Sequence, residues 1–237
     1  MPSAWLARLE LNGFAVIPDV LPPAEVERLR AATSVASNDG HALRGLLELD
    51  WVRDLARTEA VHSLMEAALG KGCFAVRGIF FDKIPGANWL VPPHQDLSIA
   101  LAEQRETDDF GPWSRKEGVV HVQPPREILE RMATIRLHLD NCDQTNGALR
   151  VVPASHRNGK LDGDSIADAT KGGETVVPRT RRRCNDFLSL AHPRLLPRPF
   201  PLAPPRRPSG IRRLRTTKRP PMALENLKFN LIGQGAQ

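Results

Sequence analysis

The most informative stretch of the chain is Pro92-Pro93-His94-Gln95-Asp96-Leu97-Ser98-Ile99, in which two prolines lead into a strand-like run. On an extended strand, residues two apart point the same way, so His94 and Asp96 present an imidazole and a carboxylate to one face. Such a pair supplies two ligands of a metal site. A third ligand, usually a distant His, would complete the 2-His-1-carboxylate arrangement that leaves open positions on Fe(II). The mixed nitrogen and oxygen donors favour iron over a closed zinc site.

Short apolar or alternating runs flank this segment and predict strands. Residues 73–84 are rich in Phe, Val and Ile and end at a Pro-Gly turn. Similar short apolar or alternating runs recur at 97–101, 119–122, 134–140 and 148–152. Short strands separated by turn-forming residues predict a β-sandwich or barrel. An isolated H-x-D triplet more often lies in a solvated loop, so the metal-site interpretation depends on this context.

The N-terminal third has the spacing of helices rather than of strands. Residues 14–17 form a short apolar run that predicts a buried strand. Pro22-Pro23 then marks a helix start, and further helices are predicted from Asp50 and from Thr58. The chain is therefore expected to be mainly β with N-terminal helices.

A set of short motifs accompanies these predicted elements between about residues 9 and 165. They are Asn12-Gly13-Phe14, Phe80-Phe81-Asp82-Lys83-Ile84-Pro85, His94-Gln95-Asp96, Gly111-Pro112-Trp113, Lys116-Glu117-Gly118-Val119, His121-Val122-Gln123-Pro124-Pro125, Arg136-Leu137-His138-Leu139-Asp140, Asn146-Gly147-Ala148-Leu149 and Val152-Pro153-Ala154-Ser155-His156-Arg157. Together they resemble the phytanoyl-CoA dioxygenase family, with Ala154 in place of Gly in its Pro-Gly-Ser-His turn. The joint set is far more specific than the H-x-D triplet alone.

The resemblance implies a double-stranded β-helix, which is a jelly-roll-like fold, that holds Fe(II) and binds 2-oxoglutarate. The implied reaction is oxidative decarboxylation of 2-oxoglutarate to succinate and CO2, coupled to hydroxylation of an unactivated C–H bond. By the same resemblance, His94 and Asp96 are the first two iron ligands. Because Asp96 is retained, no coordination position is vacated for halide, and the resemblance favours hydroxylation over halogenation.

The family also has a distal His in a late strand and, shortly after it, an Arg for the 2-oxoglutarate carboxylate. His192 stands near the expected separation and is the candidate third ligand, although the motif around it is absent. Lys83 and Arg136 are the candidate cations for 2-oxoglutarate, because Arg offers a bidentate fork and Lys a point charge. Such cations are more often solvated or strand-pairing groups. His121 is a candidate contact for co-substrate or substrate, and His138 is more simply explained as a satisfied strand histidine.

The net charge of +6 is distributed unevenly along the chain. Between residues 179 and 221 stand twelve Arg, one Lys and nine Pro with a single acid, Asp186, so this segment carries +12. The other 20 basic and 26 acidic side chains give −6. Because Pro removes a donor from a β-ladder, the Pro-rich part is not expected in a central strand. We therefore expect a jelly-roll domain over 1–178 and an irregular Arg/Pro-rich tail over 179–237.

Two explanations of this tail remain open. An out-of-frame translation of a GC-rich coding strand yields excess Arg and Pro, and translating the other two frames past codon 178 tests that idea. Alternatively, clustered Arg could neutralise phosphates. Only Phe187 and Phe200 stand among these arginines, so base stacking is poorly supported and a nucleic-acid partner is not favoured.

The remaining composition limits the class of protein. Three cysteines without C-x-x-C spacing argue against a disulfide framework, so a reducing, cytoplasmic compartment is expected. The sequence has no run of about 18 apolar residues, and no membrane partner is expected. We expect an Fe(II)- and 2-oxoglutarate-dependent dioxygenase that uses O2 to hydroxylate a small organic substrate, with impaired activity if the distal His and Arg are lost. The alternative is a non-catalytic jelly-roll protein that binds a metal or a small molecule.

Overall fold

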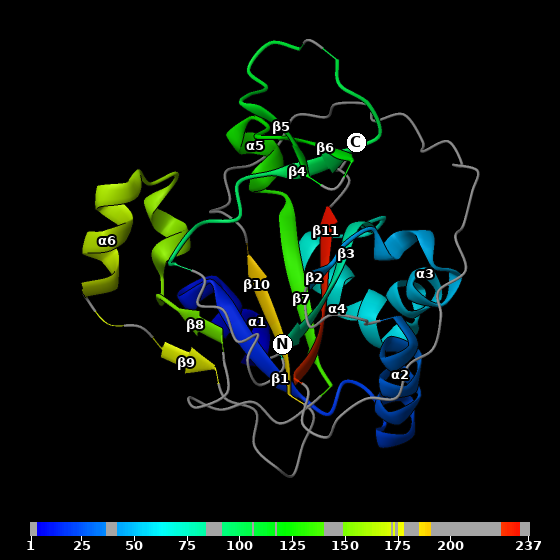
Figure 1. Cartoon of the computed structure of the whole chain (residues 1–237). Helices are drawn as coiled ribbons and strands as arrows, with labels where there is room; N and C mark the ends of the chain where they lie inside the picture. The colour runs from blue at the N-terminus through cyan, green and yellow to red at the C-terminus, as the bar shows by residue number, and fades with distance from the viewer. Residues whose placement is uncertain are drawn as a thin grey trace.

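A computed structural model of the chain describes residues 4–36, 42–83, 92–105, 107–116, 118–139, 149–171, 173, 175–177, 185–190 and 224–232. The helices are α1 (Ala4–Asn12), α2 (Pro23–Ala36), α3 (Asp50–Arg57), α4 (Glu59–Leu69), α5 (Arg126–Leu129) and α6 (Gly163–Lys171), with short 3-10 turns η1 (Leu46–Glu48) and η2 (Ser155–Asn158). The first four helices precede most of the strands, so the helical front predicted from the sequence is present (Figure 1).

Within the described residues, the strands form three antiparallel sheets. The largest has the order β1-β10-β7-β11-β3-β2, and its strands are β1 (Phe14–Pro18), β2 (Ala42–Leu43), β3 (Phe74–Lys83), β7 (Met132–His138), β10 (Asn185–Leu190) and β11 (Leu224–Ile232). A second sheet has the order β4-β6-β5, with β4 (Ile99–Leu101), β5 (Trp113–Lys116) and β6 (Val119–Val122). A third pairs β8 (Leu149–Val151) with β9 (Thr175–Val177). In Figure 1 the second sheet lies above the upper ends of β7 and β11.

The main core lies between the helices and one face of the large sheet. It includes Leu55 of α3, Met65 of α4, Phe80 of β3 and Leu137 of β7, each at most 1% exposed. Side chains alternate along a strand, so the neighbours of these core residues extend from the opposite face of the sheet. Arg136 lies between Ile135 and Leu137, which are both core residues, and therefore belongs to that opposite face.

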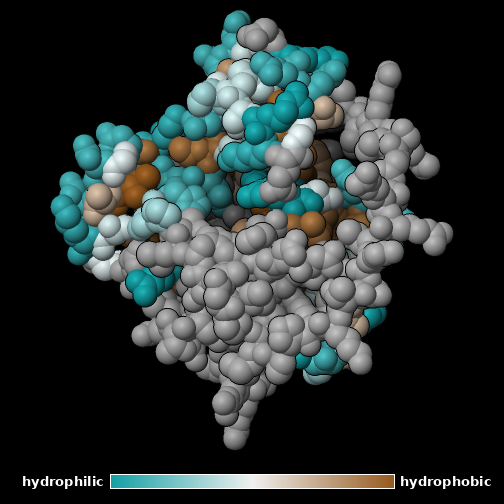
Figure 2. Space-filling view, viewed as in Figure 1, coloured by the Kyte–Doolittle hydropathy of each residue, from teal (hydrophilic) through white to brown (hydrophobic). Residues whose placement is uncertain are grey.

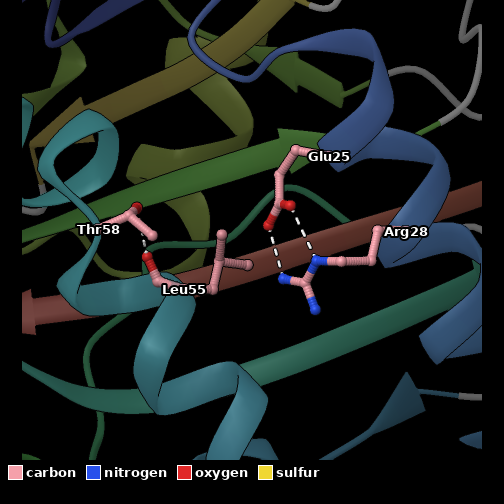
Figure 3. A network of polar contacts seen from close by, with 4 residues as sticks. All are labelled: Glu25, Arg28, Leu55 and Thr58. Carbon is pink, nitrogen blue, oxygen red and sulfur yellow. Dashed lines mark hydrogen bonds and ion pairs between the residues drawn. The ribbon is translucent and has the colours of Figure 1, made fainter.

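Local polar contacts support the helices that cover this core. On α2, Arg28 donates to Glu25 through Nε (2.8 Å) and Nη2 (2.6 Å), and the pair lowers the pKa of the Glu25 carboxyl (Figure 3). At the end of α3, the Thr58 hydroxyl donates to the carbonyl of Leu55 over 2.8 Å. Thr58 thus satisfies a carbonyl that the end of a helix leaves without an intrahelical partner.

Two strands of the large sheet come from the segment expected to be an irregular tail. β10 pairs with β1 and β7, and β11 lies between β7 and β3. The sequence of β11 alternates apolar Leu227 and Phe229 with polar Lys228, and its apolar residues stand opposite Leu137 and Ile135 of β7. This matching alternation explains why β11 fits a central position. The rest of the expected tail lies outside the described residues, so the division of the chain at residue 178 stays a prediction.

Candidate metal centre

His94 and Asp96 lie in an irregular segment between β3 and β4 rather than on a strand, which begins at Ile99. The expectation of an extended strand through the triplet was therefore wrong in its local structure. The two side chains nevertheless converge, with 3.9 Å between Nε2 of His94 and Oδ1 of Asp96. Their side chains are 58% and 40% exposed, so a ligand from solvent can reach both.

The imidazole of His94 is held by the backbone. Its Nδ1 lies 2.8 Å from the carbonyl oxygen of Pro92, which can only accept. Nδ1 therefore carries a proton and donates, and Nε2 is the ring nitrogen on the side of Asp96. A hydrogen bond of this kind, from the second ring nitrogen to a backbone carbonyl, is what orients histidine ligands in metal sites.

The two donor atoms lie near the separation that one metal ion requires. Bonds from a metal to imidazole nitrogen and carboxylate oxygen are about 2.1 Å long, so two ligands at neighbouring positions of a six-coordinate ion lie about 3.0 Å apart. From the observed 3.9 Å, Nε2 and Oδ1 would move together by about 0.9 Å to bind one ion. Among the described residues, no group of three His, Cys, Asp or Glu side chains converges, so a third ligand would have to come from the remaining parts of the chain.

Gln95 anchors the triplet to a distant loop. Its Nε2 donates to the carbonyl of Gly159 over 2.8 Å, and its Oε1 accepts from the backbone N–H of Leu161 over 2.8 Å. Gly159 is buried, so this contact is shielded from water. The side chain between the two candidate ligands thus connects them to the segment that follows η2.

A cationic group that was not among the predicted site residues interacts electrostatically with Asp96. Arg77 of β3 is partly buried, and burial lowers the pKa of its guanidinium, whereas the nearby Asp96 carboxylate raises it. Arg44, which follows β2, also acts on Arg77 and lowers its pKa by like-charge repulsion. The signal in the sequence is a single Arg within the otherwise uncharged stretch of β3 from Phe74 to Phe81.

His121 of β6 faces the same cluster. It is 2% exposed, and burial lowers the pKa of its imidazole, while a contact of 3.0 Å from Nδ1 to the Val119 carbonyl opposes the shift. The positive charges of Arg77 and Arg44 lower the pKa further. The interpretation of His121 as a residue near the co-substrate or substrate stays a prediction.

The other predicted site residues differ in how far the structure describes them. Arg136 lies on β7, partly buried, on the face turned away from the helices, and His138 of the same strand is 2% exposed. Lys83 ends β3 and pairs with Leu224 of β11 through the backbone, but its side chain lies outside the described part. His192 lies outside the described residues altogether.

Comparison with protein families is consistent with the site. The model of the phytanoyl-CoA dioxygenase family matches residues 9–179, which include the His94–Asp96 pair and β1 to β9. The chain belongs to the phytanoyl-CoA dioxygenase family. Membership in it supports an iron- and 2-oxoglutarate-dependent oxygenase in general. No curated protein matches the chain.

Solved structures confirm the fold of this phytanoyl-CoA dioxygenase family member. EctD from S. alaskensis with bound Fe is similar over 98% of this chain and 76% of its own, with a TM-score of 0.57 and 13% identity. HygX from Streptomyces hygroscopicus with iron bound covers 98% of this chain and 87% of its own, with a TM-score of 0.59 and 14% identity. AviO1 from Streptomyces viridochromogenes Tue57 covers 100% and 97%, with a TM-score of 0.58 and 15% identity. The predicted jelly-roll fold is thus confirmed.

The helices of the described parts are too short or too polar for a bilayer crossing.

Proposed function

We propose that this protein is an Fe(II)- and 2-oxoglutarate-dependent dioxygenase that uses O2 to hydroxylate a small organic substrate. The observation that carries the proposal is the convergence of His94 Nε2 and Asp96 Oδ1 to 3.9 Å, with the opposite ring nitrogen held by Pro92. We assign His94 and Asp96 as two iron ligands and His192 as the third. Structures of EctD and HygX with iron, and of both with 2-oxoglutarate, agree with this cofactor pair.

Three residues of the triplet, His94, Gln95 and Asp96, would position and charge the iron site. Iron held by these residues would supply the oxidative decarboxylation of 2-oxoglutarate that is coupled to substrate hydroxylation. His94 presents Nε2 as the ligand nitrogen because Nδ1 is engaged by the Pro92 carbonyl. Asp96 contributes a negative charge, which raises the pKa of the Arg77 guanidinium. The anchoring of Gln95 limits the movement of both ligands.

We assign the co-substrate carboxylate to Arg136, with Lys83 as the alternative cation. Arg136 lies on the face of the large sheet that is turned away from the helices, which we call the inner face, and the buried His138 lies two residues further along β7. Lys83 lies at the end of β3. A guanidinium binds a carboxylate through two parallel hydrogen bonds, which fixes the orientation of the bound acid as well as its charge.

The test compares iron binding and succinate formation in matched variants. We expect His94→Ala and Asp96→Ala each to lose anaerobic Fe(II) binding and iron-dependent conversion of 2-oxoglutarate to succinate. His62→Ala is the control, because His62 also lies near a carboxylate, 3.7 Å from Glu66, but on the surface of α4. Equal loss in all three variants, or no loss in the first two, would contradict the proposal. Iron binding without any succinate would instead favour a non-catalytic metal-binding protein.

A further inference from the structure

Arginines from neighbouring strands lie on the inner face of the large sheet, which is the face turned away from the helices. On β3, Phe80 belongs to the helical core, and a Cβ on Gly78 would meet Leu46 of η1 at 3.1 Å. Residues 78 and 80 therefore point to the helices, and Arg77 and Ile79 point inward.

Arg44 reaches the same inner side from β2. Leu43 pairs with Phe80 in the antiparallel register, and both side chains contact the helical core. The next residue along the chain is Arg44, so alternation turns it to the inner face. Continuing this register, Arg44 stands opposite Ile79, two residues from Arg77 on the same face of β3, and its charge lowers the pKa of Arg77. Because neighbouring strands lie about 4.8 Å apart, both side chains can reach one bound group.

Two further groups interact electrostatically with these arginines. The charges of Arg77, Lys116 and Arg44 lower the pKa of His121 on β6. The Asp96 carboxylate raises the pKa of Arg77. In Figure 2, apolar residues lie in a recess below the hydrophilic upper part of the molecule, where β4, β5 and β6 are found. Two guanidinium groups on one face of neighbouring strands, both partly buried, present the N–H donors that a carboxylate binds.

We propose that Arg44 and Arg77 bind the carboxylate of an acidic organic substrate next to the His94–Asp96 pair. This inference rests on the proposed dioxygenase function and specifies its substrate class. Arg136 lies on β7, and β11 separates β7 from β3, so about 9.6 Å of sheet lies between the two strands. That separation leaves Arg136 for 2-oxoglutarate and the Arg44–Arg77 pair for the substrate. Each guanidinium presents a planar fork that matches a carboxylate.

The test uses calorimetric titration of the full chain, loaded anaerobically with Fe(II) and saturated with 2-oxoglutarate. The probes are linear monocarboxylates from acetate to octanoate, each paired with its primary amide. We expect the acids to bind and the amides to bind at least about 10-fold more weakly. Arg77→Gln and Arg44→Gln should each weaken acid binding by about 10- to 100-fold, as loss of a charged hydrogen bond does. Arg77→Lys should keep part of the affinity for the acids. Arg57→Gln is the control at the exposed end of α3, and it should leave the affinity for the acids unchanged.

Two further titrations distinguish a loss of acid binding from a loss of 2-oxoglutarate or iron binding. The affinity of Arg77→Gln for 2-oxoglutarate should equal that of the unmodified protein, and an equal loss for co-substrate and acid would overturn the proposal. Equal binding of acids and amides, or no binding of either, would also overturn it. The same titrations without metal report on the arginine pair alone, so a failure of iron binding is distinguished from a failure of acid binding. Thermal unfolding of each variant verifies that it folds, and Arg44→Gln replaces Arg77→Gln if the latter does not.

Discussion

Replacing Gln95 with Ala tests whether the candidate metal ligands depend on the contact between their segment and the loop after η2. The side chain makes two hydrogen bonds of 2.8 Å, one to the carbonyl of Gly159 and one from the N–H of Leu161. Each such bond contributes about 1 kcal/mol net, so their joint loss costs about 2 kcal/mol. Because Gly159 is buried, its carbonyl would also lose a partner that water does not easily replace.

Loss of the two Gln95 hydrogen bonds should also weaken metal binding. If the anchored conformation is the one in which the His94 and Asp96 side chains converge, a cost of about 2 kcal/mol weakens metal binding by up to about 30-fold. Anaerobic titration with Fe(II), and with redox-stable Co(II), measures this change. Urea unfolding of the same samples measures the loss of stability.

Gln104→Ala is the matched control, because Gln104 is exposed and lies in the loop after β4. We expect it to leave both metal affinity and the free energy of unfolding unchanged. Unaltered Fe(II) affinity in Gln95→Ala, together with a clear loss of stability, would refute the idea that Gln95 positions the ligand pair.

Three other substitutions or conditions test the fold around the site. Phe80→Ala should lower the free energy of unfolding by about 3–5 kcal/mol in urea, because the ring is fully buried in the main core. Gly13→Ala should lower the free energy of unfolding more than Gly118→Ala does. Both glycines have a positive φ, which costs an Ala about 1–2 kcal/mol. Only at Gly13 would the new Cβ also overlap a side chain, that of His156. Burial lowers the pKa of His121 below its unfolded value of about 6.5. The unfolded chain therefore binds the extra proton first, and the protein should lose stability as pH falls below about 6.5. His121→Gln should flatten the dependence of the urea midpoint on pH.

Much of the architecture could be predicted from the sequence because hydrophobic patterns are local. The run over 73–84 corresponds to β3, 119–122 matches β6, and helices begin at Asp50 and beside Thr58, as expected. β11 was missed because it follows a long Arg/Pro-rich stretch, although its own alternation matches that of β7. Local patterns do not reveal which distant strand will accept such a segment, since pairing depends on the whole sheet.

The candidate site was predictable in its residue types but not in its surroundings. His94 and Asp96 could be selected from the triplet, yet they converge from an irregular segment that is held by Pro92 and Gln95. The position of Arg77 beside Asp96 depends on the approach of β3 to the loop before β4. No spacing rule within one strand predicts that approach.

The central claim is that this chain holds Fe(II) through His94 and Asp96 and uses it to oxidise 2-oxoglutarate. The most direct measurement is succinate formation by the full chain under O2, with Fe(II) and 2-oxoglutarate supplied, beside the Asp96→Ala variant. We predict succinate that requires iron in the unmodified protein and none above background in the variant. Equal succinate from both proteins, or none from either despite bound iron, would contradict the account.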